Sequence, residues 1–260
     1  MQHNPSSPGD CVQILGCRLD PIDSDEATAR ILELARTGDG SQIVTLGTEM
    51  VVHAQRDHRF RAIVNGSALS LCDTVGLLAV ARRRGAPLRE RVTGVELIER
   101  LCAGAAAHDV PVYLLGGAEG VAVEAAANLQ SRFPALRVAG ARSGYFREDE
   151  SAAIVSAIAE SGARLLFVGL GSPRQEFWLA EHLRETGCGA GVGVGGSFDV
   201  VAGRIARAPQ TIRRLGLEWL YRLLKEPWRW RRQLALPRFV WLVALDEFGI
   251  RSTRKGMVSL

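Results

Sequence analysis

The sequence predicts an α/β protein with a mostly parallel β-sheet, helices on both faces of the sheet, and a basic helical appendage at the C-terminus. Two observations predict the sheet. Short apolar runs alternate with stretches of helical periodicity, as strands and helices do in a parallel sheet. Many of the 28 glycines stand at the ends of the apolar runs, where the chain has to turn sharply. The appendage is predicted by a change of period after Gly203.

Residues 23–108 are expected to hold the first part of the alternation. The acidic run Asp23 to Glu26 precedes a stretch of helical periodicity, and carboxylates there stabilise the positive end of a helix. The elements expected after this capped helix, in chain order, are a strand at 42–46, a helix at 49–65, a strand at 68–72, and helices at 74–84 and 95–108. A loop with Arg91 and Gly94 separates the last two helices.

From residue 110 the alternation becomes regular. The expected elements, in chain order, are a strand at 112–115, a helix at 121–133, a strand at 136–141, a helix at 148–161, a strand at 165–168, a helix at 173–186 and a strand at 190–194. In parallel sheets of this kind, ligands bind at the carboxyl ends of the strands. The glycine-rich turns at those ends are therefore where we expect a binding site.

The C-terminal segment has its own composition. Apolar residues from Ile212 to Leu224 form one helical stripe, and a second helical run follows at 237–248. Residues 201–260 hold 13 Lys or Arg against four Asp or Glu, whereas residues 1–200 hold 19 against 24. Four of the five tryptophans also lie in this segment. We therefore divide the chain into an α/β domain at 1–203 and a basic, Trp-rich helical appendage at 204–260, which we expect to meet an anionic membrane surface.

Composition and cysteine usage exclude several classes of protein. With 47% hydrophobic and 23% charged residues, the chain can bury a large core. The five cysteines include no CxxC pair, so we expect reduced core residues. No secretory signal is visible at the N-terminus, and no apolar run approaches the roughly 20 residues that span a bilayer. We expect a cytoplasmic protein with peripheral membrane contact and no nucleic-acid partner.

Two turns have the construction of phosphate-binding sites. In Gly169 to Glu176, Ser172 is a candidate N-cap, Pro173 fits the first helical position, and Gln175 completes a capping box. Free N–H groups at such a helix start can hold an anion such as pyrophosphate. Gly116 to Gly120 has the same strand, turn and helix order. An ordinary turn that binds nothing is the alternative for both segments.

Other patterns argue against a cofactor. Gly191, Gly193 and Gly196 match GxGxxG, but they lie within a strand instead of opening a helix, which disfavours a dinucleotide site. Asp23 and Asp25 spell the DxD that holds divalent metals in some transferases, but here the motif caps a helix. No Cys and His residues have zinc-site spacing. We therefore expect no metal and no organic cofactor.

Polar residues at three strand ends and loops are candidates for chemistry. Asp73 follows a buried strand, and a carboxylate there is placed to take a proton from a hydroxyl group. Thr45 ends another strand. Each of these two residues has helix capping as its alternative role. Arg91 has the planar donor set that binds phosphate bidentately, with a solvated loop arginine as the alternative.

Taken together and in this order, the segments from about residue 12 to 245 resemble the TagA/WecG/CpsF glycosyltransferase family. The matching stretches are TLGTE at 45–49, LCDTVG at 71–76, RVTGVEL at 91–97, LLGG at 114–117, GYF at 144–146, VGLGSPRQE at 168–176, GVGGSFD at 193–199, RAP at 207–209 and LEWLYR at 217–222. The specificity lies in the ordered set. The resemblance implies a Rossmann-like sheet and an inverting, metal-independent transferase of cell-surface polysaccharide biosynthesis.

The resemblance also implies the substrates and the roles of residues. A UDP-activated sugar would be attacked by a hydroxyl of an undecaprenyl-diphosphate-linked saccharide at the inner face of the cell membrane, with Asp73 as the base. The residues carried over to the substrate pocket are Thr45, Arg91, Gln175 and Glu176; those carried over to its nucleotide-facing lining are Gly116, Gly117, Tyr145, Gly195, Gly196 and Asp199. We expect the ring of Tyr145 to stack on a base, and Arg207, Arg214 and Arg222 to reach a diphosphate.

One position departs from the family pattern. Gly47 stands where the family usually has Asn, which removes an amide donor and acceptor from the pocket. The donor sugar therefore stays open among N-acetylmannosamine, N-acetylmannosaminuronic acid, glucose and glucuronic acid. A nucleotide-dependent oxidoreductase on the same fold class and a non-catalytic membrane-associated binding module are the competing functions. Self-association into a homo-oligomer is open as well.

Overall fold

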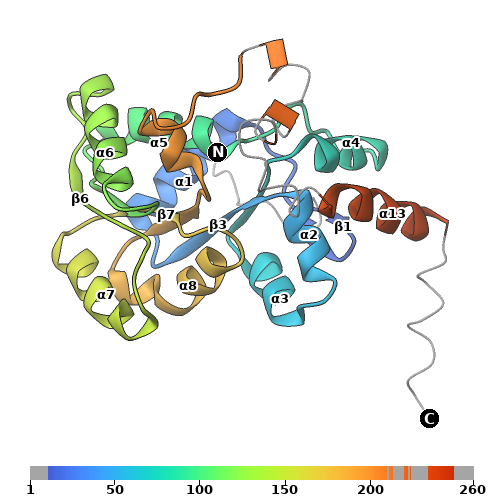
Figure 1. Cartoon of the computed structure of the whole chain (residues 1–260), viewed down its shortest axis with the longest axis horizontal. Coiled ribbons are helices and arrows are strands. Elements are labelled where there is room, and N and C mark those ends of the chain that lie inside the picture. The colour runs from blue at the N-terminus through green and yellow to red at the C-terminus, as the bar shows by residue number, and fades with distance from the viewer. Residues whose placement is uncertain (1–10, 210, 213–219, 222, 224–233, 249–260) are drawn as a thin grey trace, which may run out of the picture.

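A six-stranded parallel sheet forms the centre of the computed structural model, which describes residues 11–209, 211–212, 220–221, 223 and 234–248 (Figure 1). The strand order is β4-β3-β8-β7-β5-β6, and every pair is parallel. The strands are β3 (Ser41–Leu46), β4 (Leu69–Cys72), β5 (Val112–Gly116), β6 (Val138–Arg142), β7 (Leu165–Gly169) and β8 (Ala190–Gly193). The predicted parallel sheet is confirmed.

Helices cover both faces of the sheet, as predicted. Successive side chains of a strand point to opposite faces, and in the buried strands both sets are apolar, so each face is covered by helices. In β7, Phe167 points into one core, whereas Leu166 and Val168 point into another. The first face carries α1 (Ser24–Thr37), α5 (Gly94–Ala107), α6 (Val121–Arg132) and α9 (Ser197–Val201). The opposite face carries α2 (Thr48–Ala54), α3 (His58–Gly66), α7 (Ser151–Glu160) and α8 (Arg174–His182), and α4 (Val75–Arg83) adds Leu77 and Ala81 to the core of α2 and α3.

The helices leave the sheet in diverging directions. The chain runs from β3 to its neighbour β4 through α2 and α3 on one face, and from β5 to its neighbour β6 through α6 on the other. Strands β8 and β7 lie between these two connections. In open α/β sheets a ligand crevice forms where connections diverge in this way, at the carboxyl ends of the strands.

Several element boundaries differ from the sequence predictions. The helix expected at 49–65 is two helices, because the carboxylate of Asp57 accepts a hydrogen bond from the Phe60 backbone N–H at 2.9 Å and starts α3. The helix expected at 173–186 ends at His182 and is followed by the 3-10 turn η2 (Arg184–Thr186), and the turn η1 (Glu148–Glu150) precedes α7. A short antiparallel pair, β1 (Val12–Ile14) and β2 (Cys17–Leu19), was not predicted.

The predicted helix start and the cysteine assignment are confirmed. Asp23 caps α1 by accepting a hydrogen bond from the Glu26 backbone N–H at 2.9 Å, and Asp25 forms an ion pair with Arg100. Both carboxylates of the DxD motif are therefore engaged in structural contacts. All five cysteines are free thiols, and four are buried.

The second helical run of the appendage is confirmed as α13 (Ala235–Glu247), which lies against α2 (Figure 1). Phe239 and Val243 are buried in the core that α2 and α4 share. Asp246 pairs with Arg84 at 2.8 Å, which ties the end of α13 to the end of α4. Within the described ranges, no helix has the length and apolar character needed to span a bilayer. Most of the stripe at 212–224 lies outside the described residues.

Candidate functional site

The carboxyl ends of the strands meet at one edge of the sheet and bring the predicted site residues into one row. Leu46 pairs with Cys72, Val168 with Gly193, and Gly116 with Gly169. The row therefore begins with Asp73, which follows β4, and with Thr45, which lies in β3. It continues through the segment after β8, which holds Gly195 and Gly196, and ends at Gly116, Gly117 and Tyr145 after β5 and β6.

Asp73 stands at the β4 end of this row beside the loop that carries Arg91. The Asp73 N–H donates to the Leu46 carbonyl at 3.0 Å, and the Val92 N–H donates to the Cys72 carbonyl at 2.7 Å. The carboxylate and the guanidinium are thus supplied by neighbouring strand-end segments. Burial raises the pKa of the adjacent Cys72 thiol to about 12, and the charge of Asp73 adds to this rise. The thiol stays protonated and is not a nucleophile at neutral pH.

Neither Thr45 nor Asp73 has the capping role considered as its alternative. The N-cap of α2 is Gly47, and the N-cap of α4 is Thr74. Thr45 is 8% exposed, and its hydroxyl donates to the Gly193 carbonyl at 2.8 Å, which joins β3 to β8. The Thr45 oxygen keeps its capacity to accept a hydrogen bond.

The two glycine-rich turns touch each other through their backbones. Gly116 has φ +149°, and a Cβ atom there would lie 2.5 Å from the Gly169 carbonyl oxygen. The Gly117 N–H donates to the same oxygen at 3.1 Å. Glycine is required because only a residue without Cβ allows this approach. The turns after β5 and β7 therefore form one surface.

The capping box predicted from Ser172 and Gln175 is wrong. Helix α8 begins at Arg174, and no side chain caps it. Gln175 is 2% exposed, and its Oε1 accepts a hydrogen bond from the Gly195 N–H at 2.9 Å. The side-chain amide of Gln175, which the predicted capping box would have used, is therefore bound by the distant Gly195 N–H. The Gly195 N–H is engaged by the protein itself.

Gln175 and Glu176 form a buried pair behind the row. The Gln175 Nε2 donates to the Glu176 Oε1 at 2.7 Å, and Glu176 is 1% exposed. A Cβ atom on Gly193 would lie 2.7 Å from the Gln175 Nε2, so the pair packs directly on the end of β8. Both side chains hold the segment after β8 in place. Burial raises the pKa of the Glu176 carboxyl, against the hydrogen bond from Gln175 that lowers it.

This pKa direction predicts a pH dependence of stability. The native carboxyl keeps its proton to higher pH than the unfolded one, whose pKa is 4.5, so the native state binds more protons in between. The stability that the neutral acid contributes is complete below this pH and falls as the pH rises toward the native pKa. Because Glu176→Gln removes the titration, the free energy of unfolding of the variant relative to wild type should increase over that window. Denaturant unfolding at a series of pH values measures this difference.

The exposed Glu181, which pairs with Arg59, offers the matched control. Glu181→Gln should show no such pH-dependent gain. A difference between Glu176→Gln and wild type that is the same at every pH would contradict the prediction.

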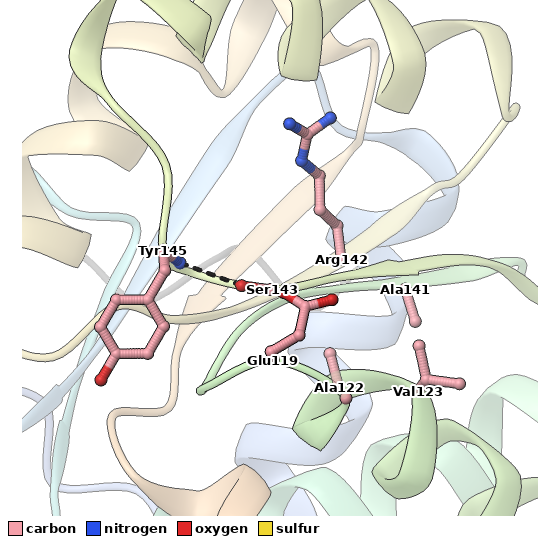
Figure 2. Close-up of a pocket in the computed structure, with 8 residues that line it drawn as sticks. Glu119, Ala122, Val123, Ala141, Arg142, Ser143 and Tyr145 are labelled. Atoms are coloured by element: carbon pink, nitrogen blue, oxygen red, sulfur yellow. Dashed lines mark hydrogen bonds between the residues drawn. The ribbon is translucent and has the colours of Figure 1, made fainter.

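A hollow of about 300 Å³ lies beyond the ends of β5 and β6 (Figure 2). Its lining residues are Glu119, Gly120, Ala122, Val123, Ala141, Arg142, Ser143 and Tyr145. The ring of Tyr145 lies at one side of it and is 80% exposed, and the small apolar side chains lie at the other. Of this set, the sequence analysis named Tyr145 as a site residue and placed Glu119 and Gly120 in a candidate phosphate-binding turn. The polar residues Arg142 and Ser143 were missed.

The arginines expected to reach a diphosphate have different outcomes. Arg207 pairs with Glu96 in the first turn of α5 at 2.6 Å, and the Thr93 hydroxyl donates to the same carboxylate at 3.0 Å. Asp199 lies in α9, next to this turn. Arg214 and Arg222 lie outside the described residues. In the part of the chain that the structure describes, no three His, Cys, Asp or Glu side chains are grouped as metal ligands.

Comparison with known proteins gives consistent matches over most of the chain. The profile of the "Glycosyl transferase WecG/TagA/CpsF family" matches residues 12–253. An N-acetylglucosaminyldiphosphoundecaprenol N-acetyl-beta-D-mannosaminyltransferase of Bacillus spizizenii is 35% identical over 234 residues, which cover 88% of this chain and 90% of that protein. A protein of the same name from Bacillus subtilis strain 168 is 30% identical over 208 residues, 80% of each chain.

Proposed function

The chain belongs to the WecG/TagA/CpsF family of glycosyl transferases, and on this premise we propose that it moves a sugar from a UDP donor to a hydroxyl of an undecaprenyl-diphosphate-linked saccharide. One observation carries the proposal. Asp73 and the loop with Arg91 stand at one end of a row of strand ends, and the touching glycine turns with the Tyr145 hollow stand at the other. A carboxylate, a cation and a hollow beside an exposed tyrosine ring along one edge are what a nucleotide-sugar transferase needs.

In this proposal Asp73 is the general base. It takes the proton of the acceptor hydroxyl while that oxygen forms a bond to the anomeric carbon of the donor. The bond from that carbon to the diphosphate breaks on the opposite side, so the configuration inverts and UDP leaves. Arg91 and backbone N–H groups of the glycine turns stabilise the charge of the leaving diphosphate in place of a divalent metal ion.

The space around Gly47 is relevant to the identity of the donor sugar. Its backbone is extended, with φ −110°, and a Cβ atom there would meet only the Thr74 Cγ2 at 3.5 Å, an ordinary contact. Space for a side chain is therefore present beside Asp73. The names of the relatives make N-acetylmannosamine the first donor to test. Because of the open space at Gly47, N-acetylmannosaminuronic acid, glucose and glucuronic acid are the alternative donor sugars to test.

The test is a transfer assay with full-length protein, a panel of UDP-sugars and a synthetic lipid-diphosphate acceptor. We expect sugar transfer with one donor of the panel, and equal rates with and without EDTA because no metal ion takes part. Activity lost in EDTA and restored by magnesium or manganese would overturn the metal-free mechanism. Tight binding of a nicotinamide cofactor without transfer would favour the oxidoreductase, and UDP-sugar binding without turnover would favour the binding module.

We also propose that α13 and the basic segment around it place the enzyme on the inner face of the cell membrane. Val240, Trp241 and Phe248 are exposed on the side of α13 away from the core, and Trp241 is 64% exposed. Aromatic residues favour the headgroup level, and each Lys or Arg near an anionic surface adds about 1 kcal/mol. A second copy of the chain is the alternative occupant of this face.

Membrane binding is tested by flotation with anionic vesicles at low salt. Truncation at Gly203 would also remove Phe239 from the core, so substitutions on the exposed face are the sharper test. Trp241→Ser with Phe248→Ser should reduce the floating fraction severalfold, because two exposed aromatic anchors are lost. Val123→Ser, an exposed apolar residue on α6, serves as the control. Flotation equal to wild type would contradict the proposal, and a change in oligomeric state would favour self-association.

A further inference from the structure

The segment after β6, residues 143–147, is here named the Tyr145 loop. It lies on the glycine turn of β5, because the Gly144 N–H donates to the Gly117 carbonyl at 2.8 Å. A Cβ atom on Gly144 would lie 3.0 Å from the Gly116 Cα, so the two backbones are in direct contact. The Tyr145 loop is therefore the third member of the surface that the turns after β5 and β7 form.

Arg174, the first residue of α8, holds this loop from the other side. One terminal nitrogen, Nη1, donates to the Gly144 carbonyl at 3.0 Å, and the other, Nη2, donates to the Phe146 carbonyl at 2.9 Å. The guanidinium carbon also lies 4.5 Å from the centroid of the Phe146 ring. The two carbonyls that Arg174 binds belong to the residues on either side of Tyr145.

Tyr145 is held in place through its backbone and not through its ring. Its N–H donates to the Ser143 hydroxyl at 3.1 Å, whereas its side chain is exposed at the hollow (Figure 2). An exposed ring on a backbone fixed at both neighbours is a preorganised stacking surface, which loses little freedom when a planar ligand binds. The fork geometry of arginine is what allows one side chain to fix both carbonyls, since a lysine ammonium is a point donor.

We propose that Arg174 is a positioning residue for the nucleoside part of the donor: it holds the Tyr145 loop so that the ring of Tyr145 is placed to stack on the base. This inference rests on the proposed function, because it takes the ligand of the hollow to be the base of UDP. Both terminal nitrogens of Arg174 are occupied by the loop, so its effect on the donor runs through Tyr145.

A double-mutant cycle tests this coupling, with the Kd for UDP measured by calorimetry. Stacking on an aromatic side chain changes affinity by about tenfold or more, so Tyr145→Ala and Arg174→Met should each raise the Kd for UDP about tenfold. The double variant should bind no more weakly than Tyr145→Ala alone. Turnover at saturating donor should stay within about twofold of wild type, because the reacting atoms lie at the other end of the row.

Two further variants serve as a conservative substitution and as a control. Arg174→Lys keeps the charge and the alkyl stem and removes only the forked guanidinium. It therefore tests the two hydrogen bonds to the loop even if Arg174→Met fails to fold. We expect the same rise in the Kd for UDP. Arg147→Met changes an exposed arginine of the same loop that pairs with Asp149, and it should leave the Kd unchanged.

The possible failures are distinguishable. Equal Kd values for wild type and Arg174→Lys, or losses that add in the double variant, would overturn the inference alone and leave the transferase proposal standing. A wild-type protein that does not bind UDP would overturn the proposed function and the inference with it.

Discussion

Asp73→Asn is expected to lower the turnover number by about a hundredfold or more while the Kd for UDP stays unchanged. The acceptor hydroxyl must lose its proton as the new glycosidic bond forms, and an amide cannot accept that proton. Asn has the same shape and keeps the backbone hydrogen bond from Asp73 to Leu46, so the site geometry should survive. The measurement is sugar transfer to a lipid-linked acceptor at saturating donor, together with UDP binding by calorimetry.

The control for this substitution is Asp25→Asn, because Asp25 is an exposed carboxylate on α1 whose ion-pair partner is Arg100 on α5. Its turnover should match wild type. Near-normal transfer by Asp73→Asn would mean that another group takes the proton, and a large loss of UDP binding would mean that Asp73 supports the donor instead.

Gly116→Ala is expected to lower the free energy of unfolding by about 3 kcal/mol and to weaken UDP binding. Two costs combine. The backbone at φ +149° is a conformation that residues with a side chain rarely adopt, and the new Cβ would lie 2.5 Å from the Gly169 carbonyl oxygen. Strain and overpacking each cost about 1–3 kcal/mol. The backbone of Gly169 can move only by separating β5 from β7, so we expect the turn surface to be disturbed.

Gly171→Ala separates the two costs. Gly171 also has a positive φ, +76°, but a Cβ atom there would meet nothing within 4 Å. It should lose only about 1 kcal/mol, from backbone strain. Denaturant unfolding of both variants measures the difference, and equal losses would contradict the close-packing explanation for Gly116.

The parallel sheet could be predicted from sequence because its strands are buried on both faces and read as continuous apolar runs. Leu114, for example, points to one core and Leu115 to the other, so both positions are apolar. The pair β1 and β2 was missed because three residues are too few for a period. The break between α2 and α3 was missed although residues 55–59 are all polar and interrupt the apolar spacing; Asp57 in this stretch is the residue that caps α3.

The site was harder to predict where distant segments decide the role of a side chain. Ser172 and Gln175 have the local spacing of a capping box, but the amide of Gln175 is bound by the Gly195 N–H, 20 residues further on. The position of Glu176 in the first turn of a helix suggests a solvent-facing acid, and only the packing around β8 shows that it is buried. Glu119, from the turn after β5, and Arg142, the last residue of β6, both line the hollow, and no short motif joins them.

The pairing of β3 with β8 has a consequence for how the protein folds. Residues 41–44 at the middle of the sheet find their partners at 190–193, so most of the chain has to be present before this pair can close. Closing so long a loop costs chain entropy before any contact is gained, and such contacts slow folding. Until then, β3 and β7 each expose an unpaired strand edge, which is a site for aggregation. During synthesis on the ribosome, the row that carries Asp73 and Gly195 is therefore completed only after β8 has emerged.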